Sequence, residues 1–440
     1  MIPAMQPDCF ATRTTSAHPA GAALTQILAA ATHAADPGAQ VARVLQSNPQ
    51  HIVVAGEALA PQRVLLLAVG KAAPAMAAAA CAVLGTRLHH GVVIYKDIDP
   101  AEPRDPRLHY YAAGHPVPDE RSQAAGVAAR TLVTQAQPDD LVLVLLSGGG
   151  SALMVDLAAG ITLDMLQPLT RALLASGADI TAINTVRRRI DTIKGGGLLR
   201  AASHTTMRTL ILSDVIGNSL TAIASGPTVP NTDAPTAAYD VLTTYGIADS
   251  VDPAIAAACL APLPTQPSAA PAHIIADIRH ALAAAADCAR ALGYSPVIID
   301  AAVHGEAAIV GAHIATILRT LPPLGEPRCL LWGGETTVTL GATHGTGGRN
   351  QTLALAIAQG IAAGPDCLVA CYASDGGDGP TDAAGAVIDQ TTWQRAQAQG
   401  YAPEVHLTHH NAYPLFAAIG DLLMPGPTGT NVNDLVVAIL

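Results

Sequence analysis

The chain has 440 residues and a formal net charge of −11 at pH 7, which disfavours nucleic acid as a partner. This charge does not exclude nucleotide binding, because a phosphate site needs only local positive groups. Hydrophobic residues make up 50% of the chain, yet no apolar run reaches the roughly 18–20 residues of a membrane-spanning helix. The first 20 residues lack the pattern of a secretory signal. We therefore expect a cytoplasmic protein with no membrane partner.

Strands and helices alternate along the first part of the chain. The apolar segments 63–69, 141–146 and 208–213 are typical of strands in a parallel sheet buried on both faces. Residues 1–20 are expected to form a poorly ordered leader, and the prolines of 262–271 predict a linker. Helices are predicted at residues 22–45, 121–135, 163–176 and 180–193.

The same alternation resumes after the linker. Strands are predicted at residues 273–278, 296–300, 329–332, 336–340, 367–373 and 435–440. Helices are predicted at residues 281–292, 306–318 and 349–362. The pattern predicts two α/β domains with mostly parallel sheets, an N-terminal domain at 21–261 and a C-terminal domain at 272–440.

Polar and glycine residues follow several of these strands. The strand at 141–146 ends in Ser147, Gly148, Gly149, Gly150 and Ser151, whose backbone N–H groups could turn towards a phosphate. A tight turn without a ligand explains a single run of glycines equally well. Polar and glycine residues, however, also follow other predicted strands of this chain. Ligands of open α/β sheets bind outside the carboxyl ends of the strands, so one shared site is expected there.

Two cationic residues precede predicted helices. Lys71 follows the strand at 63–69, and a cation opposes the dipole of a helix N-terminus unless an anion is bound. Arg349 follows the glycine-rich loop 343–348 and could fork two phosphate oxygens. A solvated surface lysine and a helix-capping arginine are the alternatives for these two positions.

Acidic residues complete the predicted site. Asp214 and Asp375 each come directly after a strand, and Asp375 together with Asp378 could hold Mg²⁺ through carboxylate oxygens. Cap or turn chemistry is the alternative for Asp378. The three arginines at 187–189 are more often a solvated or ion-paired helix face than a ligand site. Positioning and charge neutralisation by these groups favour phosphoryl transfer.

Two other functions stay open on the residues alone. An NAD(P)H-dependent reductase would need a GxGxxG loop after a strand, and the sequence has none. A non-catalytic nucleotide or sugar-acid binding protein would use the same phosphate-directed groups without turnover. A homodimer is one of the assembly states that the sequence leaves open.

The motifs together resemble the glycerate 2-kinase family whose C-terminal part is the MOFRL domain. Its members are often labelled hydroxypyruvate reductase. The matching stretches span about residues 20–440 in order: VGKAAPAM (69–76), AGHPVPDERS (113–122), LLSGGGSAL (145–153), INTVRRRID (183–191), KGGGL (194–198), LSDVIGNSLTAIASGPT (212–228), GGETTV (333–338), GTGGRNQ (345–351), ASDGGDGPTDAAG (373–385) and TGTNVNDL (428–435).

The resemblance implies ATP-dependent phosphorylation of D-glycerate at its 2-hydroxyl, with ATP and D-glycerate as small-molecule substrates and Mg²⁺ as the cofactor. It implies that Lys71, Arg349 and Asp214 are catalytic, that Asp375 binds the metal, and that residues 147–151, Glu335 and Asn431 contact phosphate or substrate. It also suggests an active-site cleft between the two domains, with the last strands returning to pack on the first domain.

Overall fold

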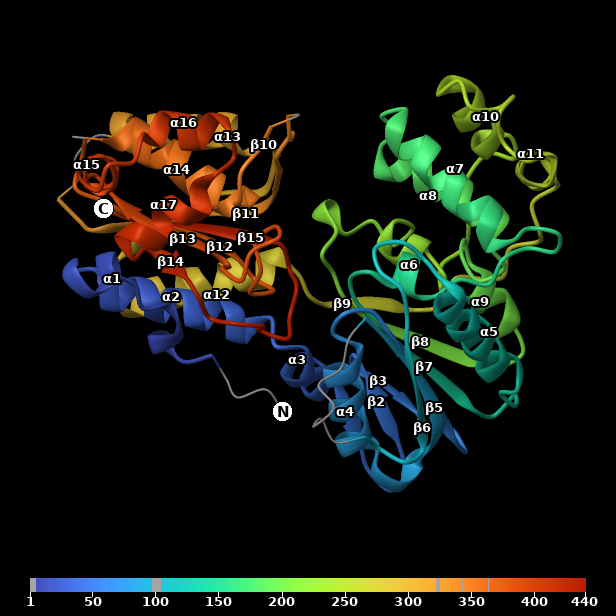
Figure 1. Ribbon diagram of the computed structural model, residues 1–440. Helices are drawn as coiled ribbons and strands as arrows, with labels where there is room; N and C mark the ends of the chain where they lie inside the picture. Colours follow the sequence, from blue (N-terminus) through green and yellow to red (C-terminus); the bar gives the residue numbers. More distant parts are fainter. Residues whose placement is uncertain (1–4, 97–103, 322–324, 342, 363) are drawn as a thin grey trace. The chain divides into compact units, whose positions relative to one another are not determined.

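The computed structural model describes residues 5–96, 104–321, 325–341, 343–362 and 364–440. The chain divides into two compact units (Figure 1). Unit 1 comprises Met1–Asp36 and Ala276–Leu440, and unit 2 comprises Pro37–Ile275. Among the described residues, no helix combines the length and the apolar character that crossing a membrane would require.

Unit 2 is built around a six-stranded sheet in the order β6-β5-β4-β7-β8-β9. The strand pairs from β6 through β8 are all parallel, as predicted. Every residue of β4 and β7 is buried, because helices cover both faces of this sheet. The strands are β4 (Val64–Val69), β5 (Leu88–Tyr95), β6 (Leu108–Ala112), β7 (Leu141–Leu146), β8 (Thr206–Leu212) and β9 (Ala272–Ala276).

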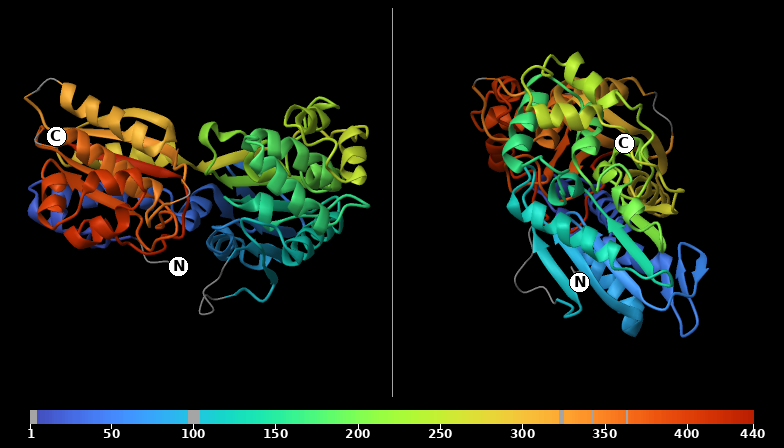
Figure 2. Two further views of the ribbon diagram at one scale, coloured as in Figure 1. Left: turned by 45° about the horizontal axis from the view of Figure 1, so that its top comes forward. Right: turned by 90° about the vertical axis from the view of Figure 1, so that its right-hand side faces the viewer.

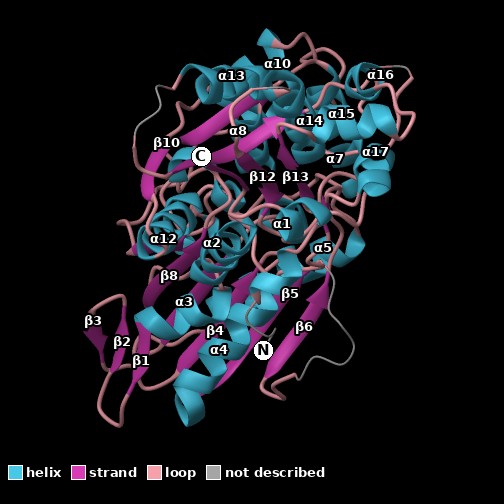
Figure 3. Ribbon diagram, turned by 90° about the vertical axis from the view of Figure 1, so that its left-hand side faces the viewer, coloured by secondary structure: helices cyan, strands magenta, loops and turns pink. Residues whose placement is uncertain are grey.

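Helices lie on both sides of this sheet, with α4 on one face and α5 on the other (Figure 1). Three short strands near the start of the unit form a separate antiparallel sheet (Figure 3). Their bounds are β1 (Leu45–Ser47), β2 (Ile52–Val54) and β3 (Glu57–Leu59). The helices are α3 (Pro37–Val44), α4 (Ala73–Leu84), α5 (Glu120–Thr134), α6 (Gly150–Leu153) and α9 (Gly197–Ala201).

Four further helices of unit 2 gather beside one another and share a hydrophobic core of their own (Figure 2). Leu166 and Leu173 of α7 pack in this core with Val186 of α8 and Leu242 of α10. The bounds are α7 (Leu163–Ala175), α8 (Ile180–Ile190), α10 (Ala237–Thr244) and α11 (Pro253–Leu260).

Unit 1 contains the second six-stranded sheet, in the order β10-β11-β15-β12-β13-β14. Among the described residues, only the β10–β11 pair of this sheet is parallel, and the four other strand pairs are antiparallel. The α/β class is confirmed, but the expected parallel pairing is wrong for this sheet. The strands are β10 (Ser295–Glu306), β11 (Arg328–Thr337), β12 (Leu368–Ala373), β13 (Gly385–Asp389), β14 (Leu422–Leu423) and β15 (Asp434–Ile439).

The last strand explains why the pairing differs. β15 lies between β11 and β12 and pairs antiparallel with both, so it belongs to the sheet of unit 1, whereas the last strands were expected to return to pack on the first domain. All six residues of β15 are buried, which is consistent with a central position. The two strands predicted around 333–335 are one strand, β11. Gly334 adopts a φ of +152° there, and a side chain at this position would overlap the backbone of Val303.

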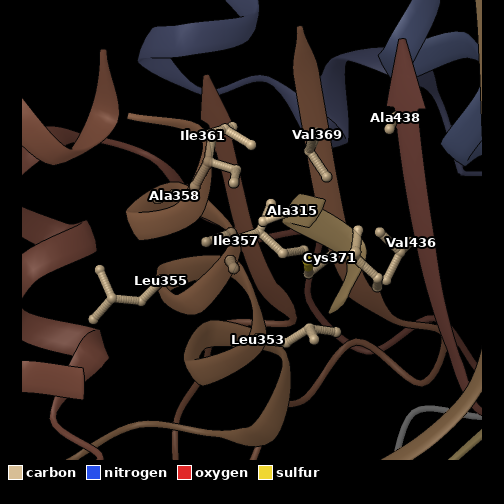
Figure 4. Close-up of a cluster of buried hydrophobic side chains, with 14 of the residues drawn as sticks. Ala315, Leu353, Leu355, Ile357, Ala358, Ile361, Val369, Cys371, Val436 and Ala438 are labelled. Carbon is tan, nitrogen blue, oxygen red and sulfur yellow. The ribbon is translucent and has the colours of Figure 1, made fainter. Parts of the chain in front are cut away.

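Helices cover both faces of this sheet, with α13 and α14 on one face and α2 and α12 on the other (Figure 1). Leu353, Ile357 and Ile361 recur every four residues on α14 and lie beside Val369 and Cys371 of β12 (Figure 4). Full burial of such an aliphatic side chain stabilises the fold by about 1.5–3 kcal/mol. The helices are α12 (Ile278–Ala291), α13 (Ala307–Thr320), α14 (Arg349–Ile361), α15 (Thr392–Ala398), α16 (Pro403–Thr408) and α17 (Ala412–Ile419).

The N-terminal segment is structured from residue 7, which differs from the expected poorly ordered leader at 1–20. It forms a 3-10 turn at Pro7–Phe10 and the helices α1 (Arg13–Ala17) and α2 (Gly21–Ala34). Phe10 is fully buried and meets the ring of Tyr372 edge-on, with 5.2 Å between centroids. The backbone N–H of Thr14 donates to Asp421 at 2.8 Å. These contacts fix the segment to unit 1, so the unit boundaries at 36/37 and 275/276 differ from those predicted.

Candidate active site

The loops after β4 and β7 are joined by hydrogen bonds that fix the backbone at Lys71. The N–H of Lys71 donates to the carbonyl of Gly148 at 2.9 Å, and the N–H of Ala72 donates to the hydroxyl of Ser147 at 3.0 Å. Gly70 has a φ of +124°, and any side chain there would overlap Ser147. The Lys71 residue is exposed, two positions before α4 begins. Ser147 itself is only 1% exposed, so its hydroxyl joins the two loops instead of facing a ligand.

The glycine run lies between two polar side chains. A Cβ on Gly148 would overlap the carboxylate of Asp214, which follows β8, and a Cβ on Gly149 would lie 3.0 Å from the ring of His115. Gly149 also has a φ of +86°. Side chains are therefore excluded at both positions, and the carboxylate of Asp214 reaches the backbone of the loop. The structure brings Asp214 and residues 147–151 together, as predicted, and adds His115.

A chain of hydrogen bonds leads from the end of this loop into α8. Ser151 and Ser225 bond through their hydroxyls at 2.8 Å, and Ser225 donates to Asn184 Oδ1 at 2.9 Å. A terminal nitrogen of Arg187 lies 3.5 Å from the same Asn184 oxygen. Sequence reasoning did not single out Ser225 or Asn184, although both lie in stretches that carry the family resemblance. A single polar residue in a helix or a helical turn gives no functional signal in the sequence when its hydrogen-bond partner is unknown.

A buried ion pair between Lys194 and Asp191 stabilises the end of the same loop. Lys194 and Asp191 have side chains that are each 2% exposed, and Lys194 Nζ donates to Asp191 Oδ2 at 2.7 Å. Lys194 also donates to the carbonyl of Met154, directly after α6, at 2.9 Å. Burial lowers the pKa of Lys194, and the carboxylate of Asp191 opposes that shift. The pair ties residues 191–194 to the end of the serine–glycine segment.

In unit 1 the guanidinium of Arg349 is held by carboxylates. It donates hydrogen bonds to both carboxylate oxygens of Asp434, at 2.6 and 2.9 Å, and lies 2.9 Å from Glu335. Burial disfavours the charged guanidinium, but the carboxylates outweigh this and raise the pKa of Arg349 above its usual value. Arg349 is therefore charged at every relevant pH. The predicted neighbours Arg349 and Glu335 are together, and Asp434 was missed because it begins a strand instead of following one.

Asp378 caps α14 from a separate loop. Its two oxygens accept the N–H groups of Asn350 and Gln351 at 3.0 and 2.9 Å, in the first turn of the helix. A Cβ at Gly348 would overlap this carboxylate, so glycine is needed where the loop enters the helix. Burial raises the pKa of Asp378 to about 6. Of the two alternatives for Asp378, the structure shows cap chemistry.

Replacing Asp378 with alanine is expected to destabilise the protein by about 2–4 kcal/mol, because two buried N–H groups lose their acceptor. The folded state binds a proton on Asp378 more tightly than the unfolded state, whose reference pKa is 3.8. The stability that the Asp378 carboxyl contributes to the wild-type protein therefore falls as the pH rises from about 4 to about 6. Urea unfolding of both proteins at pH 4 and pH 7 should show a larger difference between them at pH 4.

The matched control is Asp382→Ala, since Asp382 is an exposed neighbour that accepts a hydrogen bond from the hydroxyl of Tyr413. We expect it to change stability by less than about 0.5 kcal/mol. Equal losses in the two variants, or a difference that does not depend on pH, would contradict the assignment of Asp378 as the cap.

Asp375 and Asn431 lie in loops of unit 1. Asp375 follows β12 and accepts the N–H of Gly377 at 3.1 Å, while Asn431 accepts the N–H of Asn433 at 3.3 Å. Within the described parts of the chain, no three metal-binding side chains cluster. An intermediate exposure and a carboxylate at a strand end make Asp375 chemically suited to Mg²⁺, which commonly takes one or two carboxylates and fills its other positions with water and phosphate.

The fold and these groups define a class of protein: an α/β protein whose cations and carboxylates lie in loops at strand ends, where open sheets bind anionic ligands. Comparisons with known proteins give the family. A domain of unknown function, DUF4147, matches residues 23–260, and the MOFRL family matches residues 328–434. The chain belongs to the glycerate 2-kinase family with a C-terminal MOFRL domain.

Three relatives illustrate this membership. A D-glycerate 2-kinase of Thermotoga maritima is 40% identical over 86% of this chain and 91% of its own. A protein of Agrobacterium vitis named putative hydroxypyruvate reductase is 40% identical over 85% of this chain and 98% of its own. The crystal structure of a Thermotoga maritima glycerate kinase superposes with a TM-score of 0.85 at 36% identity, covering 94% of this chain and 97% of that one.

Proposed function

We propose that this protein transfers the terminal phosphoryl group of ATP to the 2-hydroxyl of D-glycerate, giving 2-phosphoglycerate and ADP. The observation that supports it most is the fixed backbone at Lys71, which carries a cation beside the serine–glycine loop and Asp214. Its relatives named glycerate kinase share this architecture over most of their length. Phosphoryl transfer depends mainly on such positioning and charge stabilisation.

Each candidate residue has a role in this proposal. Lys71 and Arg349 stabilise negative charge on the phosphoryl group, and the N–H groups of residues 148–151 bind phosphate oxygens. Asp214 takes the proton of the 2-hydroxyl as its oxygen attacks phosphorus. Glu335 and Asn431 contact substrate. Asp375 would hold Mg²⁺, which neutralises charge on the phosphates when bound.

The hydroxypyruvate reductase name of some relatives suggests a second activity, which the loop after β4 does not favour. A dinucleotide site needs several glycines where the first strand turns into its helix, so that the backbone can approach a pyrophosphate. Here one glycine precedes Lys71, and Ser147 fills the space against it. Addition of hydroxypyruvate should therefore cause no oxidation of NADH or NADPH.

Two measurements on the purified protein decide between the functions. Release of ADP that depends on ATP, Mg²⁺ and D-glycerate would support the kinase, and NMR of the product would distinguish 2- from 3-phosphoglycerate. Nucleotide binding without ADP release from any hydroxy acid would instead support a non-catalytic binding protein.

Replacing Lys71 with alanine should lower kcat/KM by about 10²–10³-fold, the range for loss of one charge-stabilising group. Its backbone contacts use the N–H group and stay intact, so the melting temperature should hold within a degree or two. Steady-state kinetics and thermal unfolding measure both quantities. The control is Arg290→Ala, which removes an exposed pair with Asp287 on α12 and should leave kcat/KM unchanged. Full activity of Lys71→Ala would refute the role of this lysine.

A further inference from the structure

Three consecutive arginines on α8 have different surroundings. Arg188 donates hydrogen bonds to both carboxylate oxygens of Asp233, at 2.7 and 3.0 Å, and Arg189 donates to the carbonyl of Ala261. Arg187 is half-buried, and within the described residues it makes one hydrogen bond, the long contact of 3.5 Å with Asn184. Burial lowers the pKa of Arg187, and Asp191 only partly opposes this. A guanidinium is rarely taken out of water with so little compensation.

The charges near Arg187 do not cancel. Asp191, which acts on Arg187, is paired with Lys194, and Asp156, whose N–H donates to Asp191 at 3.3 Å, is paired with Arg130, so both carboxylates already have a cation. With Arg187 included, these residues carry three positive and two negative charges. The surplus of one positive charge lies in a partly desolvated region, where it attracts an anion more strongly than at the open surface.

Arg187 also lies at the serine–glycine loop. It lines a small recess together with Ser151, Asp191, Lys194 and Pro118, and the hydrogen bonds through Asn184 and Ser225 end on the hydroxyl of Ser151. Hydroxyl groups and a single guanidinium suit a ligand group with one negative charge. A polyphosphate would need several cations at the same place.

We propose that Arg187 binds the carboxylate of the hydroxy-acid acceptor beside Ser151, and so selects acids over neutral polyols. This inference rests on the proposed kinase function. Arg187 is a substrate-binding residue in it, and its planar fork matches the two carboxylate oxygens. Asn184 and Ser225 keep the guanidinium and the Ser151 hydroxyl in position.

The test is Arg187→Gln, with Arg189→Gln as the matched control on the adjacent residue of the same helix. KM for D-glycerate should rise about 30- to 150-fold in Arg187→Gln, the range for a lost hydrogen-bonded charge partner. KM for ATP should change less than twofold. The preference for D-glycerate over glycerol, which lacks the carboxylate, should fall by the same factor. Arg189→Gln should keep wild-type values.

Other outcomes overturn the inference. An unchanged KM for D-glycerate excludes carboxylate binding by Arg187, and a matching rise in KM for ATP would place a phosphate there instead. If Arg187→Gln does not fold, Arg187→Lys retains the charge without the fork, and its KM for D-glycerate should rise at least fivefold with an unchanged melting temperature. If the wild type releases no ADP with D-glycerate, the kinase proposal fails, and calorimetric titration of D-glycerate into both proteins still decides whether Arg187 binds it.

Discussion

Arg349→Ala is expected to lower kcat by about 10³-fold or more and to destabilise unit 1 by about 3–5 kcal/mol. Loss of activity follows from the proposed role of the guanidinium at the phosphoryl group. Loss of stability follows from Asp434, which is 5% exposed and would be left as a buried carboxylate without its forked partner. Glu335 would lose its ion pair as well, but its side chain is 47% exposed and contributes little.

A second variant separates these two effects. Arg349→Ala combined with Asp434→Asn removes the uncompensated charge, so most of the stability should return while kcat stays low. Urea unfolding and steady-state kinetics on the two variants and on Asp434→Asn alone measure this. Recovery of kcat in the double variant would show that Arg349 acts only by neutralising Asp434, which would contradict its role at the phosphoryl group.

The strands of the unit 2 sheet could be predicted because each is a continuous apolar run that can be recognised from its own sequence. The apolar runs 64–69 and 141–146 are typical of buried strands, and the prediction of the strand at 141–146 matches β7 at both ends. The sheet of unit 1 could not be predicted in the same way. Its central strand β15 is more than 90 residues from β11 in sequence, and the apolar pattern of a buried strand does not state its direction or its neighbours.

The N-terminal segment shows the same limit. Residues 7–17 contain few apolar side chains, and their order depends on Tyr372, Asp421 and Arg395, all more than 350 positions away. A composition typical of a flexible leader is therefore compatible with a docked segment when distant partners supply the contacts.

Residues that directly follow a strand could be proposed for the site from the sequence. Residues whose role depends on a distant hydrogen-bond partner could not. Lys71, Asp214 and the loop 147–151 became candidates from their positions after β4, β8 and β7, and the structure brings Asp214 and the loop together. The trans-capping of α14 by Asp378 and the joining of two loops by Ser147 could not be read from spacing, because each hydrogen bond crosses between separate segments. The buried ion pair between Lys194 and Asp191 could not be read from the sequence either, because residue types alone do not show which charged side chains are buried together.

That ion pair leads to the second large expected effect. Lys194→Met should lower the free energy of unfolding by about 3–5 kcal/mol, because it removes one partner of a buried pair and leaves the charge of Asp191 uncompensated. Methionine keeps most of the volume of lysine, so lost packing contributes little. Asp191 would keep the N–H groups of Ile193 and Lys194 as donors, which cannot neutralise it. The contact between position 194 and the carbonyl of Met154 would also be lost.

The double variant Lys194→Met with Asp191→Asn distinguishes charge from packing. An asparagine oxygen can still accept the two backbone N–H groups, but the buried charge is gone, so at least half of the lost stability should return. Chemical unfolding at neutral pH measures the wild type, both single variants and the double variant as a thermodynamic cycle. A loss below 1 kcal/mol in Lys194→Met, or no recovery in the double variant, would show that the pair does not hold the serine–glycine segment through its charges. In that case its support would come from the backbone contacts of residues 191–197 alone.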